Sequence, residues 1–193
     1  MNSYPQFVEV NGRQYKINKD FRVAIECNRI AEDKTIGDLE RALGVICTLF
    51  GQDALDNPQD YEKLLKMAKK YLSCGIEDIP VRDQKKDMDF IQDYSYIKTS
   101  FRSDYGIKLD EENMHWWEFM DLMNGLSNSE LGNCCILNRI RNLRNFDVKD
   151  IKDPVQKAKI LEAKEMVSLD KKEVKLTEKQ QKSVDDFYRL LGY

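Results

Sequence analysis

The densest cluster of aromatic residues in this chain lies in the stretch Asp89–Leu126, DFIQDYSYIKTSFRSDYGIKLDEENMHWWEFMDLMNGL. It holds two tryptophans, three tyrosines and three phenylalanines. Rings of this size bury large areas and dominate the energetics of cores and interfaces. The same stretch offers no convergent set of nucleophiles or metal ligands. The chain must therefore fold so that these rings are covered, either by its own core or by a partner protein.

The composition fits a folded chain with a strongly solvated surface. At 193 residues it corresponds to one domain or two small ones, and its 41% hydrophobic content permits a real core. Charged residues make up 34%, above the usual ~25%, which favours helices with solvated faces. The formal charge is only -3, so there is no large basic field of the kind that generic nucleic-acid binding needs.

Motifs for catalysis, metal binding and export are absent from the sequence. No dinucleotide, P-loop, nucleophile-elbow or HExxH pattern occurs, so we expect no enzymatic activity and no cofactor. The five cysteines form no CxxC pair and His115 is the only histidine, so we expect no metal site. There is no apolar run long enough for a membrane span and no signal peptide, which places the protein in the cytosol where it is made.

The N-terminus predicts a β-hairpin. Asn11-Gly12 is the strongest short turn signal, because both positions tolerate positive φ. A two-residue loop pairs Val10 with Arg13 and Val8 with Tyr15, which leaves an apolar face that must lie on something else.

Helical patterns follow the hairpin. The first two are expected over 21–33, capped by Asp20, and over 36–50, capped by Thr35. A third opens at Asn57-Pro58 and ends before Gly75, with an apolar stripe made by Tyr61, Leu64, Leu65, Ala68, Tyr71 and Leu72. Three more are expected over 89–105, 112–125 and 128–144, the last opened by a capping box at Ser127 and Glu130.

These elements predict a mainly α fold with an N-terminal β-hairpin (α+β), resembling a helical bundle and containing no parallel sheet. The pattern divides the chain into four parts. These are residues 1–75 with the hairpin and three helices, a linker over 76–88, an aromatic-rich helical subdomain over 89–145, and a charged helical tail over 146–193. In the tail, Thr177 and Gln180 form another capping-box pattern, and the last helix becomes amphipathic only near its end, with Val184, Phe187, Tyr188 and Leu191.

The aromatic subdomain has a predicted core on one face of its helices. Residues at helical spacing in the fourth and fifth helices define that face. The predicted core consists of Phe90, Tyr94, Ile97, Phe101, His115, Trp116, Phe119, Met120 and Met123. Within it, His115 is expected to be a hydrogen-bonded core histidine rather than a catalytic base.

Trp117 falls outside the apolar arc, between Asn124 and Asp121 on the helical wheel. It is either the contact to a second packing layer or an exposed anchor for a partner. As a hypothesis, the partner surface consists of Trp117, Asp121, Asn124, Tyr96 and Tyr105.

A basic helix end is formed by Arg139, Arg141 and Arg144. It can be interpreted as a phosphate-contacting surface. The simpler interpretation is a solvated helix whose cations suit the negative end of the helix dipole. We favour the second, because no other basic cluster supports a groove for nucleic acid.

Several segments together resemble a known protein family. They are YKINKDFRVAIE after the hairpin (Tyr15–Glu26), DYSYIKTSFRSDYGIKL (Asp93–Leu109), MHWWEFMDLMNGL (Met114–Leu126) and a helix containing Ile140-Arg141. This order is similar to a family of small proteins from long-tailed phages and prophages of Gram-positive hosts. The resemblance covers residues 6–145. Genes of the family typically lie between those for the major tail protein and the tape measure protein.

That gene position is the position of the tail assembly chaperones, so the resemblance implies that role. The expected partners are the tape measure protein, the major tail (tube) protein and further copies of this chain. The expected location is the host bacterial cytoplasm during assembly, outside the mature virion. Two alternatives remain open: a structural head–tail or tail-completion protein of the virion, and a nucleic-acid-binding phage regulator that uses the three arginines.

Overall fold

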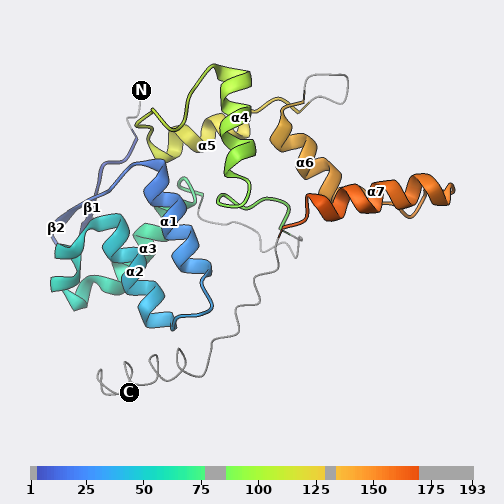
Figure 1. Cartoon of the computed structure of the whole chain (residues 1–193). Coiled ribbons are helices and arrows are strands. Elements are labelled where there is room, and N and C mark those ends of the chain that lie inside the picture. Colours follow the sequence, from blue (N-terminus) through green and yellow to red (C-terminus); the bar gives the residue numbers. More distant parts are fainter. Residues whose placement is uncertain (1–3, 77–85, 129–133, 170–193) are drawn as a thin grey trace. The chain divides into compact units, whose positions relative to one another are not determined.

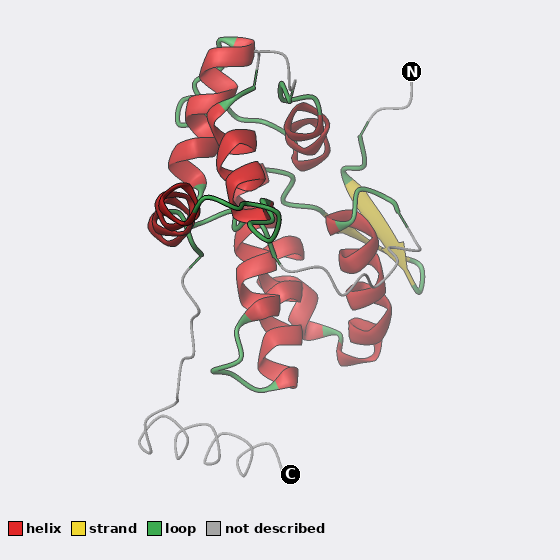
Figure 2. Ribbon diagram, turned by 90° about the vertical axis from the view of Figure 1, so that its right-hand side faces the viewer, coloured by secondary structure: helices red, strands yellow, loops and turns green. Residues whose placement is uncertain are grey.

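Seven α-helices and one β-hairpin form the part of the chain that the computed structural model describes, residues 4–76, 86–128 and 134–169 (Figure 1; Figure 2). The elements in chain order are β1 (Phe7–Val10), β2 (Arg13–Lys16), α1 (Phe21–Glu32), α2 (Asp38–Phe50), the 3-10 turns η1 (Gln52–Asp56) and η2 (Pro58–Asp60), α3 (Tyr61–Leu72), α4 (Tyr94–Tyr105), α5 (Trp116–Asn124), α6 (Ile136–Asn145) and α7 (Pro154–Met166). The predicted fold class, mainly helical with a hairpin, is confirmed, and the described residues contain no parallel sheet.

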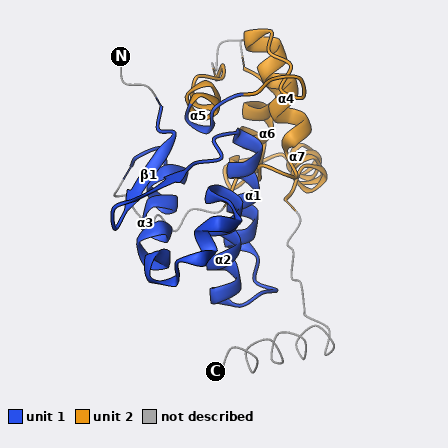
Figure 3. Ribbon diagram, turned by 90° about the vertical axis from the view of Figure 1, so that its left-hand side faces the viewer, with its two compact units in different colours: residues 1–79, 114–117, 172–193 blue, residues 80–113, 118–171 orange. Residues whose placement is uncertain are grey.

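The chain divides into two compact units (Figure 3). Unit 1 contains the hairpin, α1, α2, α3 and residues 114–117. Unit 2 contains α4, the rest of α5, α6 and α7. Most of the predicted linker over 76–88 lies outside the described residues, as does the predicted last helix with Thr177 and Gln180.

The hairpin has the register that its turn predicts. Val10 pairs with Arg13 and Val8 with Tyr15, in an antiparallel sheet. Asn11 and Gly12 both have positive φ, 52° and 77°, as this turn requires. Val10 and Tyr15 are buried, so the hairpin lays its apolar face on the helices of unit 1.

A buried carboxylate ties the hairpin to the start of α3. Asp60 is fully buried and accepts hydrogen bonds from Asn11 Nδ2 at 2.5 Å, Arg13 Nη1 at 3.1 Å and Tyr15 Oη at 2.6 Å. The hydrogen bond from Tyr15 is the main reason that the pKa of the Asp60 carboxyl lies below its ordinary value. The three donors come from the turn and the second strand, so this one side chain fixes where the hairpin sits.

Two helix starts in unit 1 differ from the sequence prediction. The second helix begins at Asp38, because Gly37 rather than Thr35 is its N-cap residue and the Gly37 N–H donates to the Glu40 carboxylate at 2.9 Å. The third begins at Tyr61, because Pro58 opens a short 3-10 turn first.

The helices of unit 2 also begin later than predicted. The fourth starts at Tyr94 instead of residue 89, because the Asp89 carboxylate accepts the N–H groups of Ile91 and Gln92, both at 2.9 Å, and holds a turn. Gly106, with φ of 72°, ends this helix as predicted. The fifth starts at Trp116 instead of residue 112.

The predicted start of the sixth helix at residue 128 is wrong. Asn128 and Cys134 pair in an isolated antiparallel bridge, and the Cys135 N–H donates to the Ser127 carbonyl at 2.9 Å. The helix begins at Ile136 with Cys135 as its N-cap. Ser127 therefore does not open this helix, and its predicted partner Glu130 lies outside the described residues.

The core of unit 2 is built on stacked phenylalanines. The rings of Phe101 and Phe119 lie 5.2 Å apart and nearly parallel, and both side chains are fully buried with Ile97 and Leu137. Ser100 is also buried, and its hydroxyl accepts the Leu137 N–H at 3.1 Å. This bond joins the start of α6 to the middle of α4.

A buried ion pair joins the end of α6 to the turn before α4. Arg144 binds Asp93 through two bonds of 2.7 Å each, and the side chains are only 10% and 1% exposed. The same guanidinium donates to the carbonyls of Asp87 and Val167, at 2.8 Å and 2.5 Å. It therefore gathers three separate segments of unit 2. The helix α7 that follows has no buried residue.

The Asp60 network should make stability depend on acid pH. Because the folded-state pKa of Asp60 is lowered, its contribution is complete above the unfolded pKa of about 3.9 and is lost as pH falls through the lower folded value. We expect Asp60→Asn to lower the urea midpoint at pH 7 and the difference from wild type to shrink below about pH 4. A difference that is constant across this range would contradict the argument.

The buried ion pair gives a second expectation. Arg144→Met should lower the free energy of unfolding by about 3 kcal/mol, because it leaves the Asp93 charge buried without its partner. Arg139→Met is the matched control on the same helix: Arg139 is exposed, and its loss should change stability by less than about 0.5 kcal/mol. If both variants lower the free energy of unfolding equally in urea denaturation, the buried ion pair does not stabilise the fold more than an exposed arginine does.

Candidate functional site

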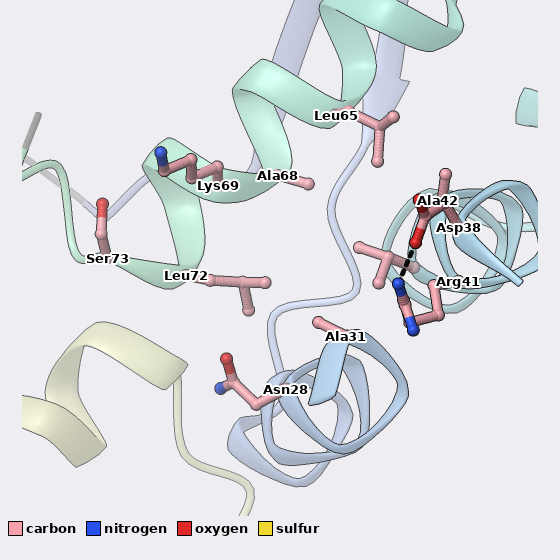
Figure 4. Close-up of a pocket in the computed structure, with 11 residues that line it drawn as sticks. Asn28, Ala31, Asp38, Arg41, Ala42, Leu65, Ala68, Lys69, Leu72 and Ser73 are labelled. Atoms are coloured by element: carbon pink, nitrogen blue, oxygen red, sulfur yellow. Dashed lines mark hydrogen bonds and ion pairs between the residues drawn. The ribbon is translucent and has the colours of Figure 1, made fainter. Parts of the chain in front are cut away.

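Three helices of unit 1 surround an open groove of about 440 Å³ (Figure 4). The groove lies between α1 and α3, with α2 forming a third wall. Its apolar walls are formed by Ala31, Ala42, Val45, Leu65, Ala68 and Leu72. Its polar side chains are Asn28, Asp38, Arg41, Lys69 and Ser73. The volume falls within the range of about 300–1,000 Å³ that is usual for binding clefts.

Small residues at helical spacing create this space. Leu65, Ala68 and Leu72 lie on one face of α3, and alanines face them from α1 and α2. Elsewhere α1 and α2 are in close contact, because a Cβ added at Gly44 would stand 3.0 Å from the Ile30 Cγ2 atom. The helices α1 and α2 are thus close together at Gly44, whereas the short alanine side chains beside α3 leave an apolar space that the described side chains do not fill.

Two cations border the groove. The Arg41 guanidinium pairs with the Asp38 carboxylate and donates to the carbonyls of Asp33 at 2.9 Å and Ile36 at 3.2 Å. Its position is therefore fixed by several partners. Lys69 is exposed on α3. The groove thus presents apolar walls beside the Arg41–Asp38 ion pair and the exposed Lys69, and its lining contains no nucleophile paired with a base.

Two adjacent tryptophans secure the end of α3. Trp116 Nε1 donates to the Leu72 carbonyl at 3.0 Å, and Trp117 Nε1 donates to the Tyr71 carbonyl at 2.9 Å. We call these two side chains the indole pair. The carbonyls of the two preceding residues are bonded by Ser73 and Gly75 N–H groups, so the whole last turn of the helix is satisfied. Since Leu72 lines the groove, the indole pair fixes one of its walls.

Gly75 makes room for the indole pair. It has φ of 82°, a conformation that other residues rarely adopt. A Cβ at this position would also stand 3.3 Å from the Trp117 ring. The Trp117 ring further lies at a shallow angle to the Tyr71 ring, with centroids 6.2 Å apart. Trp117 is half-buried and packs within unit 1, which corresponds to the second-packing-layer interpretation.

His115 orients the indole pair. Its Nδ1 accepts the Trp117 N–H at 3.0 Å, so the ring proton lies on Nε2, which is 3.1 Å from the Pro5 carbonyl oxygen. The imidazole is buried and stacks on Tyr4 with centroids 4.8 Å apart. His115 therefore acts as the cap of α5, and both its nitrogens have structural partners.

The main chain around His115 is also paired. The Phe21 N–H donates to the Met114 carbonyl at 3.1 Å, and the Trp116 N–H donates to the Lys19 carbonyl at 2.9 Å. These bonds join the start of α1 to the segment before α5, and they place His115 and Trp116 in unit 1. The remaining predicted core residues lie in unit 2, where Met123 is buried and Phe90, Tyr94 and Met120 are half-buried.

Trp117 is the one residue of the predicted partner surface that belongs to unit 1, and the other four lie in unit 2. Asp121 and Asn124 are exposed, whereas Tyr96 is half-buried. Tyr105 is bound internally, because its hydroxyl donates to the Leu122 carbonyl at 2.8 Å.

The three arginines on α6 differ in their surroundings. Arg139 is exposed, Arg141 pairs with Asp87 at 3.2 Å, and Arg144 belongs to the buried ion pair. Two of the three charges are thus neutralised by carboxylates of unit 2. The helix presents no continuous basic surface of the kind that contacts a phosphate backbone.

The cysteines show no reactive arrangement among the described residues. Burial raises the pKa of the Cys27 thiol to about 12, so it stays protonated at neutral pH. In the same residues, no three His, Cys, Asp or Glu side chains approach closely enough to hold a metal ion. None of the described helices has the length and apolarity to cross a membrane.

The sequence predicted one apolar wall of the groove but not the groove itself. The predicted stripe on the third helix contains Leu65, Ala68 and Leu72, all of which line the groove. Ala31 and Ala42, which face this stripe from two other helices, could not be recognised as groove residues from the sequence. A small side chain leaves an open space only where another helix lies opposite it, and the sequence does not show which helices face each other.

Comparison with protein-family models gives a match over most of the chain. A family model described as "Bacteriophage Gp15 protein" matches residues 1–169. No curated protein and no solved structure matches this chain.

The indole pair leads to a stability prediction. Trp117→Phe should cost about 1 kcal/mol, because it removes one hydrogen bond from a carbonyl that the Cys74 N–H also binds. Trp116→Phe should cost more, about 2–3 kcal/mol, because the fully buried ring also leaves a void. Urea denaturation followed by circular dichroism measures both, and the reverse order would contradict the assignment.

Proposed function

This chain belongs to the bacteriophage Gp15 protein family, and we propose that it is a tail assembly chaperone. In this role it binds the tape measure protein in the host cytoplasm, keeps it soluble and helps to recruit the tail tube subunits. The observation that supports this most directly is the open apolar groove between α1, α2 and α3. Tyr15–Glu26, Asp93–Leu109 and Met114–Leu126 resemble a phage family whose genes lie at the position of the tail assembly chaperones, and this supports the same role.

The groove suits a helical client. A tape measure protein is long, largely helical and apolar, so it aggregates unless its apolar faces are covered. A groove between helices can accept apolar side chains spaced along one face of such a helix. The walls supplied by Leu65, Ala68 and Leu72 are apolar, and charged side chains beside them keep the outside solvated.

Binding at a groove of this size is weak for each copy. Burying two leucine-sized side chains contributes about 1.5–3 kcal/mol each. Much of that is offset by the cost of association. Repetition of copies along a long client strengthens the whole without making any single contact permanent. Self-association of the chaperone and its displacement by tube subunits both fit such weak contacts.

Co-expression with the cognate tape measure protein tests the proposal. The wild-type chain should raise the soluble fraction of that protein and remain bound to it on a sizing column. Ala31→Glu places a charge in the apolar groove and should weaken this binding at least about tenfold, because an unpaired charge is costly to bury.

The matched control is Ala158→Glu, which changes an exposed alanine of another helix and should keep full activity. Circular dichroism confirms that both variants are folded. If the wild-type chain neither solubilises nor retains the tape measure protein, the proposed function is wrong. If Ala31→Glu behaves like Ala158→Glu, the groove is not the binding surface.

A further inference from the structure

We propose that α7 pairs in antiparallel orientation with α7 of a second copy of this chain (Figure 1). The pairing surface is one face of this helix in unit 2, which we call the α7 stripe, and it consists of Val155, Lys159, Glu162 and Met166. The stripe is the surface for the self-association that the proposed function includes. Only the purpose of the pairing rests on that function.

The α7 stripe is a single, fully solvated face. Its members follow one another at i, i+4, i+7 and i+11, counted from Val155. At 100° per residue, the four side chains fall within one arc of about 60°. Val155 is 62% exposed and Met166 is 77% exposed, and Lys159 and Glu162 are exposed between them. The stripe therefore has an apolar side chain at each end and one charge of each sign in the middle.

The helix α7 gains little stability from packing on its own chain. None of its residues is buried. Its hydrogen bonds to the rest of unit 2 lie near its C-terminal end, where Arg144 donates to the Val167 carbonyl at 2.5 Å and Lys164 donates to the Phe146 carbonyl. The half-buried Ile160 and Lys164 lie on the other side of the helix from the stripe. Because a helix of 13 residues is marginal in water without packing, a second copy that covers the stripe would stabilise it.

The stripe is complementary to itself when the second helix runs in the opposite direction. Val155 then lies level with Met166 of the second copy, and Lys159 lies level with Glu162 of the second copy. The two-fold axis repeats both contacts, so the pair has an apolar contact at each end and two ion pairs between them. In a parallel pair of the same register, each charge would instead face a like charge, which is unfavourable.

The other charges of α7 do not oppose the antiparallel pair. Lys157 and Lys164 lie on the opposite side of the helix from the stripe. Glu165 lies beside the stripe, at the level of the uncharged Gln156 of the second copy. Within the described part of the chain, no carboxylate pairs with Lys159 and no cation pairs with Glu162, so both charges can pair with a second copy.

The contact is small and therefore weak. A helix of 13 residues is about 20 Å long and about 10 Å wide, so each copy contributes a footprint of roughly 200 Å². Stable protein interfaces bury about 1,200–2,000 Å² in total. Pairing through α7 alone is thus expected only at high protein concentration. Copies that are held side by side on a client would pair more readily, because their effective concentration is higher.

Sedimentation equilibrium of the full wild-type chain, without any tape measure protein, tests the pairing. Dimers should appear as the concentration rises toward about 1 mM, the range that a scaffold supplies to neighbouring copies. Lys159→Glu should weaken dimerisation at least about tenfold, because the two-fold axis turns both ion pairs into like-charge pairs. Arg139→Glu makes the same change of charge at an exposed position of α6 and should leave the dimer unchanged. A chain that stays monomeric throughout, or equal effects of the two variants, would overturn the proposal.

A charge swap separates pairing from a general effect of charge. Glu162→Lys alone should weaken the dimer as Lys159→Glu does. Both changes in one chain recreate the two ion pairs with their signs exchanged, so this double variant should dimerise within about twofold of wild type. Failure to recover the dimer would mean that the two charges do not face each other, and the α7 stripe would be wrong. Circular dichroism verifies that all variants keep their helix content.

A mixture of two further variants tests the antiparallel orientation. In that orientation, Val155→Glu on one copy faces Met166→Lys on the other, and the opposite end keeps its apolar contact. The mixture should therefore contain more dimer than either variant alone. In a parallel pair the two new charges would be about 16 Å apart along the helix axis, and mixing would add nothing. That result would overturn the antiparallel pairing.

The pairing and the proposed function can fail separately. The groove and Ala31→Glu belong to unit 1, and the control position Ala158 lies outside the α7 stripe. A chain that stays monomeric but solubilises the tape measure protein would overturn the pairing and leave the proposed function standing. A chain that dimerises through the stripe but does not retain the tape measure protein would support the pairing and overturn the proposed function.

Discussion

The organisation of unit 1 depends on the indole pair at the end of α3. The indole N–H groups of Trp116 and Trp117 donate to the last two carbonyls of this helix, those of Leu72 at 3.0 Å and Tyr71 at 2.9 Å, and the Tyr71 carbonyl also accepts the Cys74 N–H. Burying backbone carbonyls without such partners would be costly. With them, α3 ends at a fixed place, Leu72 lies on the wall of the groove, and the segment before α5 pairs with the chain that leads into α1. The two most conspicuous residues of the sequence therefore act by hydrogen bonding as much as by size.

Local sequence signals predicted several features of the fold correctly. Asn11-Gly12 determined the hairpin and its register, since the turn needs positive φ at both residues. Gly106 marked the end of α4 for the same conformational reason. The helical class followed from periodic apolar residues. In each case the deciding interaction lies within a few residues of the signal.

Signals failed where distant residues decide the structure. Ser127 has the pattern of a helix cap, but its carbonyl accepts from Cys135 and the helix starts later. Arg144 appeared as a surface cation, yet Asp93, fifty-one residues earlier in the chain, holds it inside unit 2. The groove is of the same kind, because its space arises from three helices whose facing residues are small. None of these could be deduced from spacing along one helix.

Arg41 has a consequence for the thermodynamics of recognition. Its guanidinium is held by Asp38 and by two main-chain carbonyls before anything enters the groove. A long side chain normally loses rotamer freedom when it engages a ligand, at about 0.5–1.5 kcal/mol for each one immobilised. Here that entropy has already been lost during folding. A group that enters the groove therefore meets a guanidinium that is already ordered and already paired with Asp38, and contact with it requires no further loss of rotamer freedom from this side chain.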